Sequence, residues 1–182
     1  MNRNTKKIAL SAILSAAGVT FLFMGSLLQR LDLSAAALAG LAVVIAVIEI
    51  RGKYPVLIYF TVSLISMLIL PNKLPAVFFI IFGGIYPIFK AHFERLHPIV
   101  SWVLKFSMFN FILWLLIFFA RLLISREMII PGENLNFLAN FEIIVFLLAN
   151  SAFLLYDIVM TKIINVYIIK IRGLLKLDNY FM

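Results

Sequence analysis

Six long apolar runs, separated by short polar turns, constrain the fold of this chain more than any other feature of its sequence. Several of them approach or exceed the ~20 residues that a helix needs to cross a ~30 Å hydrocarbon core. A soluble core helix seldom runs that far without a polar stripe. The sequence therefore predicts an all-α, polytopic membrane protein, a bundle of six transmembrane helices. The predicted helices cover residues 8–28, 33–50, 55–70, 74–93, 99–124 and 137–161.

The composition is that of a chain whose main partner is the lipid bilayer. Of its 182 residues, 64% are hydrophobic and 13% are charged, whereas a soluble domain is about 45–50% apolar and about 25% charged. No polar segment is long enough for a second domain, so residues 1–182 are predicted to form one membrane domain. The basic residues behind the net charge of +8 lie mostly at the ends of apolar runs, so membrane anchoring and orientation explain them better than nucleic-acid binding does, and no nucleic-acid partner is expected.

The distribution of Lys and Arg predicts the orientation of the chain, because cytoplasmic loops of membrane proteins carry an excess of these residues. With six helices and a cytoplasmic N-terminus, eleven Lys and Arg residues fall in inner segments and three in outer loops. We therefore expect a multi-pass protein of the cell membrane with both termini in the cytoplasm. The basic tail, residues 162–182, is expected to bend near Lys162 and to lie in the membrane interface.

Polar and ionisable residues within the last two runs are candidate functional residues, because such residues are expensive in lipid and usually face a protein interior. Two consecutive helices joined by a short loop run antiparallel, so residues at equal depth have position numbers with a nearly constant sum. Three pairs meet this condition: Arg121 with Glu142, Asn110 with Asn150, and Lys105 with Asp157.

Helical periodicity tests which of these pairs can face each other. At about 100° per residue, Asn110 and Arg121 share a face of their helix, whereas Lys105 points well away from it. The long stem of Lys105 is expected to snorkel to the inner headgroups instead. The sequence therefore predicts the pairs Arg121–Glu142 and Asn110–Asn150 more strongly than the pair Lys105–Asp157.

Two interpretations of these residues stay open. In the first, the pairs clamp two helices together and neutralise each other's charge. In the second, a polar pocket that opens outward binds a substrate. The candidate substrate-binding residues are Tyr86, Asn110, Arg121, Glu142 and Asn150.

The fourth run contains the segment Gly83-Gly84-Ile85-Tyr86-Pro87-Ile88-Phe89-Lys90. Glycine and proline are tolerated in a membrane helix because neighbouring helices can satisfy the freed backbone groups. The run is therefore either a kinked, closely packed helix or a broken helix that lines a cavity. We interpret Gly83 and Gly84 first as packing residues.

Small residues at helical spacing mark faces where helices approach closely in lipid. The first run carries Ala12 and Ala16, and the second carries one face formed by Ala35, Ala39, Ala42 and Ala46. Internal packing of the first two helices is the favoured interpretation. A docking surface for another protein is the alternative.

No pattern of residues predicts catalysis. The segment of His92, Glu94 and His97 lacks the spacing of a metal site and is interpreted as a solvated cytoplasmic loop. The chain has no cysteine, no Gly-rich phosphate motif and no Ser/His arrangement of the hydrolase type. We expect neither an enzyme nor a cofactor or metal.

Six short helices, basic termini and the opening Lys6-Lys7-Ile8-Ala9-Leu10-Ser11-Ala12-Ile13-Leu14-Ser15-Ala16 resemble the substrate-binding S component of energy-coupling factor transporters. The resemblance implies that Ala12 and Ala16 dock onto a transmembrane coupling subunit. It also implies that two ATPase subunits drive the release of a captured vitamin or metal ion. The chain is further similar to uncharacterised small bacterial membrane proteins with a Gly-Gly-x-Tyr-Pro-Ile-x-Lys segment.

Two functions follow from these observations. The first is a solute-capturing subunit of a transporter of the energy-coupling factor type. The second is a membrane scaffold or assembly partner without a ligand. A buried polar pocket would favour the first function, and a dry core with an exposed face of small residues would favour the second.

Overall fold

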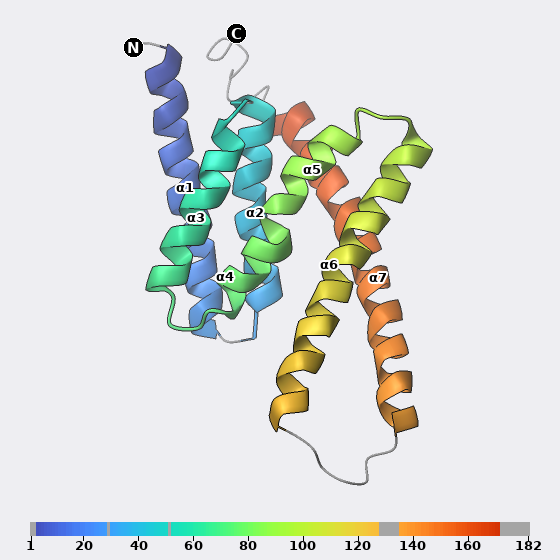
Figure 1. The fold of residues 1–182 in the computed structure, drawn as a ribbon. Helices are drawn as coiled ribbons and strands as arrows, with labels where there is room; N and C mark the ends of the chain where they lie inside the picture. The colour runs from blue at the N-terminus through green and yellow to red at the C-terminus, as the bar shows by residue number, and fades with distance from the viewer. Residues whose placement is uncertain (1–2, 29, 51, 128–134, 172–182) are drawn as a thin grey trace. The chain divides into compact units, whose positions relative to one another are not determined.

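The computed structural model describes residues 3–28, 30–50, 52–127 and 135–171, with their side chains except at 3, 120–127, 135–142 and 171. The helical elements are α1 (Arg3–Leu28), α2 (Asp32–Glu49), α3 (Tyr54–Ile69), α4 (Leu74–Phe78), the π-helical turn η1 (Phe79–Gly83), α5 (Ile85–Phe93), α6 (Pro98–Glu127), α7 (Leu135–Val166) and the π-helical turn η2 (Tyr167–Ile171) (Figure 1). Because α4, η1 and α5 follow one another as a single span, these elements form six helical segments within the described residues. The predicted all-α fold of six helices is confirmed.

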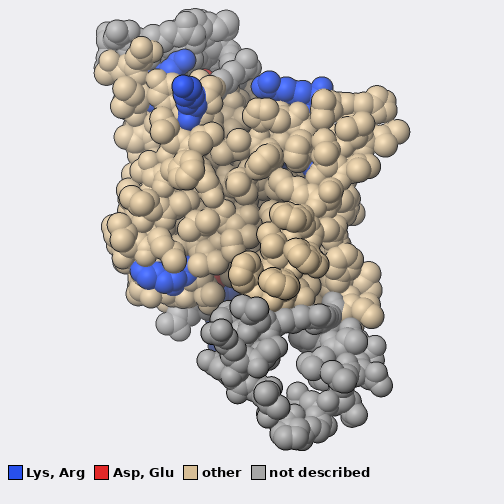
Figure 2. All heavy atoms as spheres, viewed as in Figure 1, with Lys and Arg blue, Asp and Glu red and all other residues tan. Residues whose placement is uncertain are grey.

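The lengths and composition of these helices show a multi-pass integral membrane protein. Within the described residues, five helical segments are long and apolar enough to cross a membrane, and α3, with 16 residues, is shorter. On the face drawn in Figure 2, few Lys and Arg side chains are visible among the described residues. The described part of this face consists almost entirely of residues other than Lys, Arg, Asp and Glu, as a lipid-facing surface requires.

The chain divides into two compact units, Met1–Ser101 with Leu175–Met182, and Trp102–Leu174. The first unit contains α1 to α5, and the second contains α7 and most of α6. The prediction of a single membrane domain stays a prediction.

Within the first unit, α2 packs against α1, α3 and the elements from α4 to α5. Its small residues face inward, and the core around them is apolar. The buried small residues of α2 are Ala35, Ala36, Ala39, Gly40, Ala42 and Ala46. For α2, the prediction that small residues serve internal packing is confirmed.

Glycines allow the closest approaches in this unit. A Cβ atom at Gly83 would lie 2.6 Å from the carbonyl oxygen of Ala36, so η1 and the backbone of α2 leave no room for a side chain. A Cβ atom at Gly25 of α1 would collide with the side chain of Ala35. The interpretation of Gly83 as a packing residue is confirmed.

The π-helical turn η1 lies where the sequence predicted a kinked or broken helix. The backbone N–H of Gly84 donates to the carbonyl of Phe79 over 2.8 Å, five residues earlier. The Tyr59 hydroxyl of α3 donates to the carbonyl of Ile80 over 2.9 Å. A neighbouring helix thus satisfies a carbonyl in the irregular turn, as a membrane helix requires.

A polar cluster joins the ends of three helices at the α3–α4 turn. The Ser26 Oγ of α1 donates to the Asn72 carbonyl over 3.0 Å and accepts from the Asn72 backbone N–H over 2.8 Å. The Asn72 side chain donates to an Asp32 carboxylate oxygen over 3.1 Å. Since Ser26 is only 1% exposed, this turn is held by hydrogen bonds that water does not replace.

The last helix is longer than the sequence predicted. α7 continues through Lys162 to Val166, and η2 extends the helical backbone to Ile171. The predicted helix end at Thr161 is therefore wrong, because the isolated Lys162 does not interrupt the helical backbone. The remainder of the predicted interfacial tail lies outside the described residues.

Candidate functional site

Asn110 of α6 and Asn150 of α7 form a reciprocal pair. The Nδ2 of Asn110 donates to the Oδ1 of Asn150 over 3.1 Å, and the Nδ2 of Asn150 donates to the Oδ1 of Asn110 over 3.0 Å. Each amide also donates to the carbonyl four residues earlier in its own helix, at Phe106 and Phe146, over 2.9 Å. Both N–H donors of each amide are therefore used within the protein.

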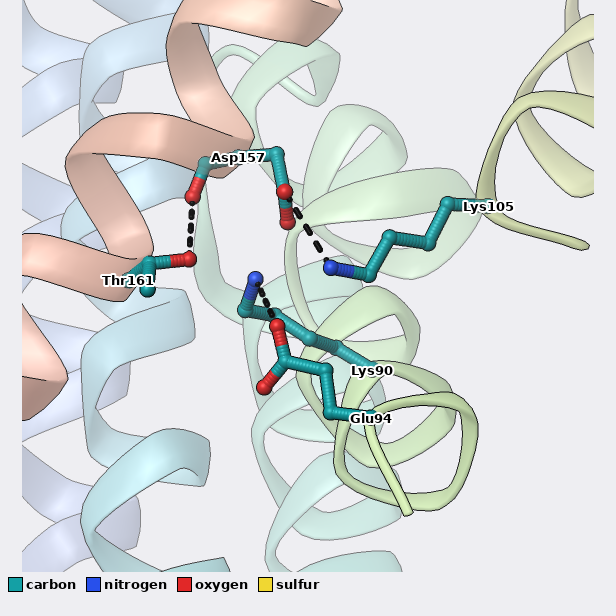
Figure 3. A network of polar contacts seen from close by, with 5 residues as sticks. All are labelled: Lys90, Glu94, Lys105, Asp157 and Thr161. Carbon is teal, nitrogen blue, oxygen red and sulfur yellow. Dashed lines mark hydrogen bonds and ion pairs between the residues drawn. The ribbon is translucent and has the colours of Figure 1, made fainter. Parts of the chain in front are cut away.

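Five residues before Asn110 on α6 and seven residues after Asn150 on α7, Lys105 pairs with Asp157 over 3.2 Å (Figure 3). The two side chains are only 5% and 3% exposed. The Thr161 hydroxyl donates to the Asp157 carbonyl over 2.8 Å, and the Lys105 ammonium lies 5.4 Å from the centre of the Trp102 ring. The expectation that Lys105 snorkels to the headgroups is wrong, because its stem turns toward α7 and places the ammonium beside a buried carboxylate.

Between these two polar pairs, phenylalanine rings join α6 to α7. The rings of Phe109 and Phe153 stack with centres 4.4 Å apart, and the ring of Phe106 meets Phe153 edge-on at 5.4 Å. Such aromatic pairs add about 0.5–1.5 kcal/mol beyond their buried area. The two helices are thus joined by alternating polar and aromatic contacts, and no ligand is needed to complete them.

The side chains of Arg121 and Glu142 lie outside the described residues, so their pairing stays a prediction. Their backbones belong to α6 and α7, respectively. The other two pairs predicted by matched depth are both formed.

Tyr86, the remaining candidate substrate-binding residue, is fully buried in α5. Its ring stacks on that of Phe82 with centres 5.0 Å apart. A role for Tyr86 in binding stays a prediction.

A second buried cation was not recognised from the sequence. The predicted helix 74–93 includes Lys90, but its burial was not predicted; it lies on α5 with 1% of its side chain exposed. Its ammonium pairs with Glu94 over 2.6 Å, and Glu94 is 40% exposed (Figure 3). The spacing of four residues between a Lys and a Glu was the signal that would have indicated this pair.

The small residues of α1 face an open groove. We name the groove between α1 and α3, with a volume of about 640 Å³, the α1–α3 groove. Ala12 and Ala16 line it and are exposed. The other lining residues are Ile8, Ser11, Ser15, Val19, Thr20, Tyr54, Leu57, Ile58, Thr61 and Ile65.

Known proteins offer no relative from which a role could be transferred. Comparisons with family models, curated proteins and solved structures find no match. The function is therefore inferred from the chain's own residues.

The described polar side chains and the groove differ in what they can do chemically. Asn110 pairs with Asn150 and Lys105 pairs with Asp157, which favours the clamp over the pocket as the interpretation of these two pairs. Within the described residues, no group of three His, Cys, Asp or Glu side chains could hold a metal ion. The α1–α3 groove is open, and its wall is largely apolar.

Proposed function

We propose that this chain is a non-catalytic assembly partner in the cell membrane, and that its α1–α3 groove receives a transmembrane helix of another membrane protein. The observation that carries the proposal is the exposure of Ala12 and Ala16 along this groove. Small residues promote helix association in lipid because they let backbones approach closely.

The hydroxyl groups of the groove support a helix rather than a polar solute as the occupant. The Ser11 hydroxyl donates to the Lys7 carbonyl over 2.8 Å, and the Thr20 hydroxyl donates to the Ala16 carbonyl over 2.9 Å. Both acceptors belong to α1 itself. These two hydroxyls therefore present mainly carbon to the groove, which suits packing against an apolar helix.

The orientation belongs to the same proposal. The excess of Lys and Arg in alternate loops supports both termini in the cytoplasm. In an otherwise cysteine-free chain, a cysteine introduced by Asn134→Cys should then react with an impermeant thiol reagent from outside intact cells. Labelling that requires disrupted cells would reverse the orientation.

The solute-capturing subunit is the second candidate, because the same surface would serve it. The S components that this chain resembles dock through the first helix, where Ala12 and Ala16 stand. That function needs a polar cavity in addition. The mutual pairing of Asn110 with Asn150 supports the assembly partner instead.

Crosslinking from both walls of the groove tests the proposal in intact cells. A photoreactive side chain would replace Ala16 on α1 or Thr61 on α3, and Met67, an exposed α3 residue outside the groove lining, would be the matched control. We expect the same membrane protein to be captured from both walls and not from Met67. The double substitution Ala12→Leu with Ala16→Leu should abolish capture from Thr61.

The identity of the captured protein separates the two candidate functions. A partner without ATPase subunits supports the assembly role, whereas a coupling subunit bound to ATPases supports transport. Capture of lipid alone, or of a second copy of this chain, would contradict the proposed occupant.

A further inference from the structure

A second groove lies at the end of the first unit where α2 turns into α3. It has a volume of about 670 Å³ and is formed by the α2–α3 turn, the start of α3 and the end of α5. We name it the basic groove. Its lining residues are Val47, Gly52, Lys53, Pro55, Val56, Leu57, Phe60, Ile88, Ala91, His92 and Arg95.

The basic groove has a charged rim and an apolar wall. Lys53 and Arg95 lie at helix ends, beside the start of α3 and after the end of α5. Phe60 follows Lys53 by seven residues on α3, which places it ~10 Å further along the helix axis. The wall therefore runs from the level of the helix ends into the apolar part of the membrane span.

The charges at this rim are of one sign. The lining contains two permanently basic side chains and no acidic one. Both Lys53 and Arg95 are exposed, and neither has an ion-pair partner within the described residues. The nearby Glu94 pairs with the buried Lys90, so it contributes little negative charge to the rim.

The local backbone adds to this preference for an anion. Gly52 has a φ of 68°, a left-handed conformation that a side chain would strain, and it turns the chain directly into α3. The first backbone N–H groups of α3 follow at once, and the positive end of a helix dipole favours a negative group there. A Cβ atom at Gly52 would meet nothing within 4 Å, so the rim is open.

We propose that the basic groove binds an anionic phospholipid. The phosphate lies between Lys53 and Arg95, and an acyl chain lies against Phe60 and Ile88. A phospholipid matches both halves of the groove, because its negative phosphate and its apolar chain are separated along the membrane normal as the rim and wall are. Basic pockets at this depth are known to select anionic headgroups. This site is distinct from the α1–α3 groove and does not depend on the function proposed for it.

Binding of defined lipids to the purified full-length chain tests the site. Phosphatidylglycerol and phosphatidylcholine with identical acyl chains would be titrated in a neutral detergent, and bound lipid would be counted by native mass spectrometry. We expect clear preference for phosphatidylglycerol. The double variant Lys53→Gln with Arg95→Gln should lower that affinity roughly thirtyfold, the factor expected for two basic contacts at a membrane surface.

A matched double variant controls for net charge. Arg30→Gln with Lys73→Gln removes two exposed basic residues, but both lie outside the groove lining. This variant should bind phosphatidylglycerol as the parent chain does. An equal loss in both double variants would show a general electrostatic effect and overturn the site.

The acyl-chain half of the proposal has its own test. Phe60→Ala should weaken binding of long-chain phosphatidylglycerol more than binding of a short-chain form. An equal effect on both would overturn the placement of the chain. Displacement of the lipid by an excess of inorganic phosphate would show a free-anion site and also overturn the proposal. Unchanged thermal unfolding of each variant would establish that lost binding is not lost folding.

Discussion

In the unit that contains α1 to α5, helices pack through small residues around an apolar core, whereas α6 and α7 meet through polar pairs and phenylalanine rings. The helices of the two units also differ in how much of them is buried. In the most apolar stretch of α2, 50% of the residues are buried, whereas in the most apolar stretch of α6 only 6% are buried. A helix with several neighbours can gain enough from close packing, whereas a helix with few contacts needs specific ones. The difference shows two ways of fixing helix positions in lipid, where apolar surface alone provides no driving force.

The largest test of this contrast is the removal of one partner of the buried ion pair. Lys105→Ala removes the ammonium group that pairs with the Asp157 carboxylate, which is only 3% exposed, and breaking such a buried pair costs roughly 3–5 kcal/mol. The free energy of unfolding would be measured by denaturant titration in mixed micelles. The double substitution Lys105→Met with Asp157→Leu should recover most of the lost free energy of unfolding, because neither charge of the pair remains. If the double variant is as unstable as the single one, the charge itself is not what holds the helices.

The counterpart in the first unit is a close backbone contact. Gly83→Ala would place a methyl group 2.6 Å from the Ala36 carbonyl oxygen, and the backbone of α2 must then shift. Overpacking of this kind costs about 1–3 kcal/mol. Gly18→Ala is the matched control, since its nearest contact is a Val62 side-chain methyl at 3.1 Å that has more freedom to move. Equal stability of the two variants in the same titration would mean that the η1–α2 contact can relax.

Run lengths and helical spacing predicted much of this structure. The six helices followed from the apolar runs, and equal depth in an antiparallel pair predicted Asn110 with Asn150 and Lys105 with Asp157. The direction of Lys105 was not predicted, because a helical wheel places the Cβ atom and ignores a four-carbon stem that reaches around the helix. For such side chains, depth is more informative than facing direction.

Small-residue patterns were ambiguous for a different reason. The alanines of α1 and α2 have similar spacing, yet those of α2 are buried, whereas Ala12 and Ala16 are exposed. The spacing of small residues shows that another helix can approach closely. Which helix packs there depends on the arrangement of the whole unit. The burial of Lys90 was missed likewise: the predicted helix 74–93 contains this residue, but its place near the helix end does not show which neighbours cover it.

A smaller effect is expected where the first unit does use a polar contact. Ser26→Ala removes both hydrogen bonds to the Asn72 backbone and should cost about 1 kcal/mol. Ser11→Ala is the control, because its hydroxyl bonds only to a carbonyl of its own helix, and it should leave the free energy of unfolding unchanged. A loss at Ser26 as large as that at Lys105 would remove the contrast between the units.

The finest test concerns the paired amides of α6 and α7. Hydrogen bonds between membrane helices contribute on average about 0.6 kcal/mol and at most about 1.7 kcal/mol. The substitutions Asn110→Leu and Asn150→Leu, made singly and together, form a double-mutant cycle that isolates the interaction. We expect a favourable coupling of this size, because each amide satisfies the other. The control cycle pairs Asn110→Leu with Ser151→Ala, whose hydroxyl bonds within α7, and should show no coupling. Equal coupling in both cycles would mean that general packing, rather than the amide pair, joins the two helices at this depth.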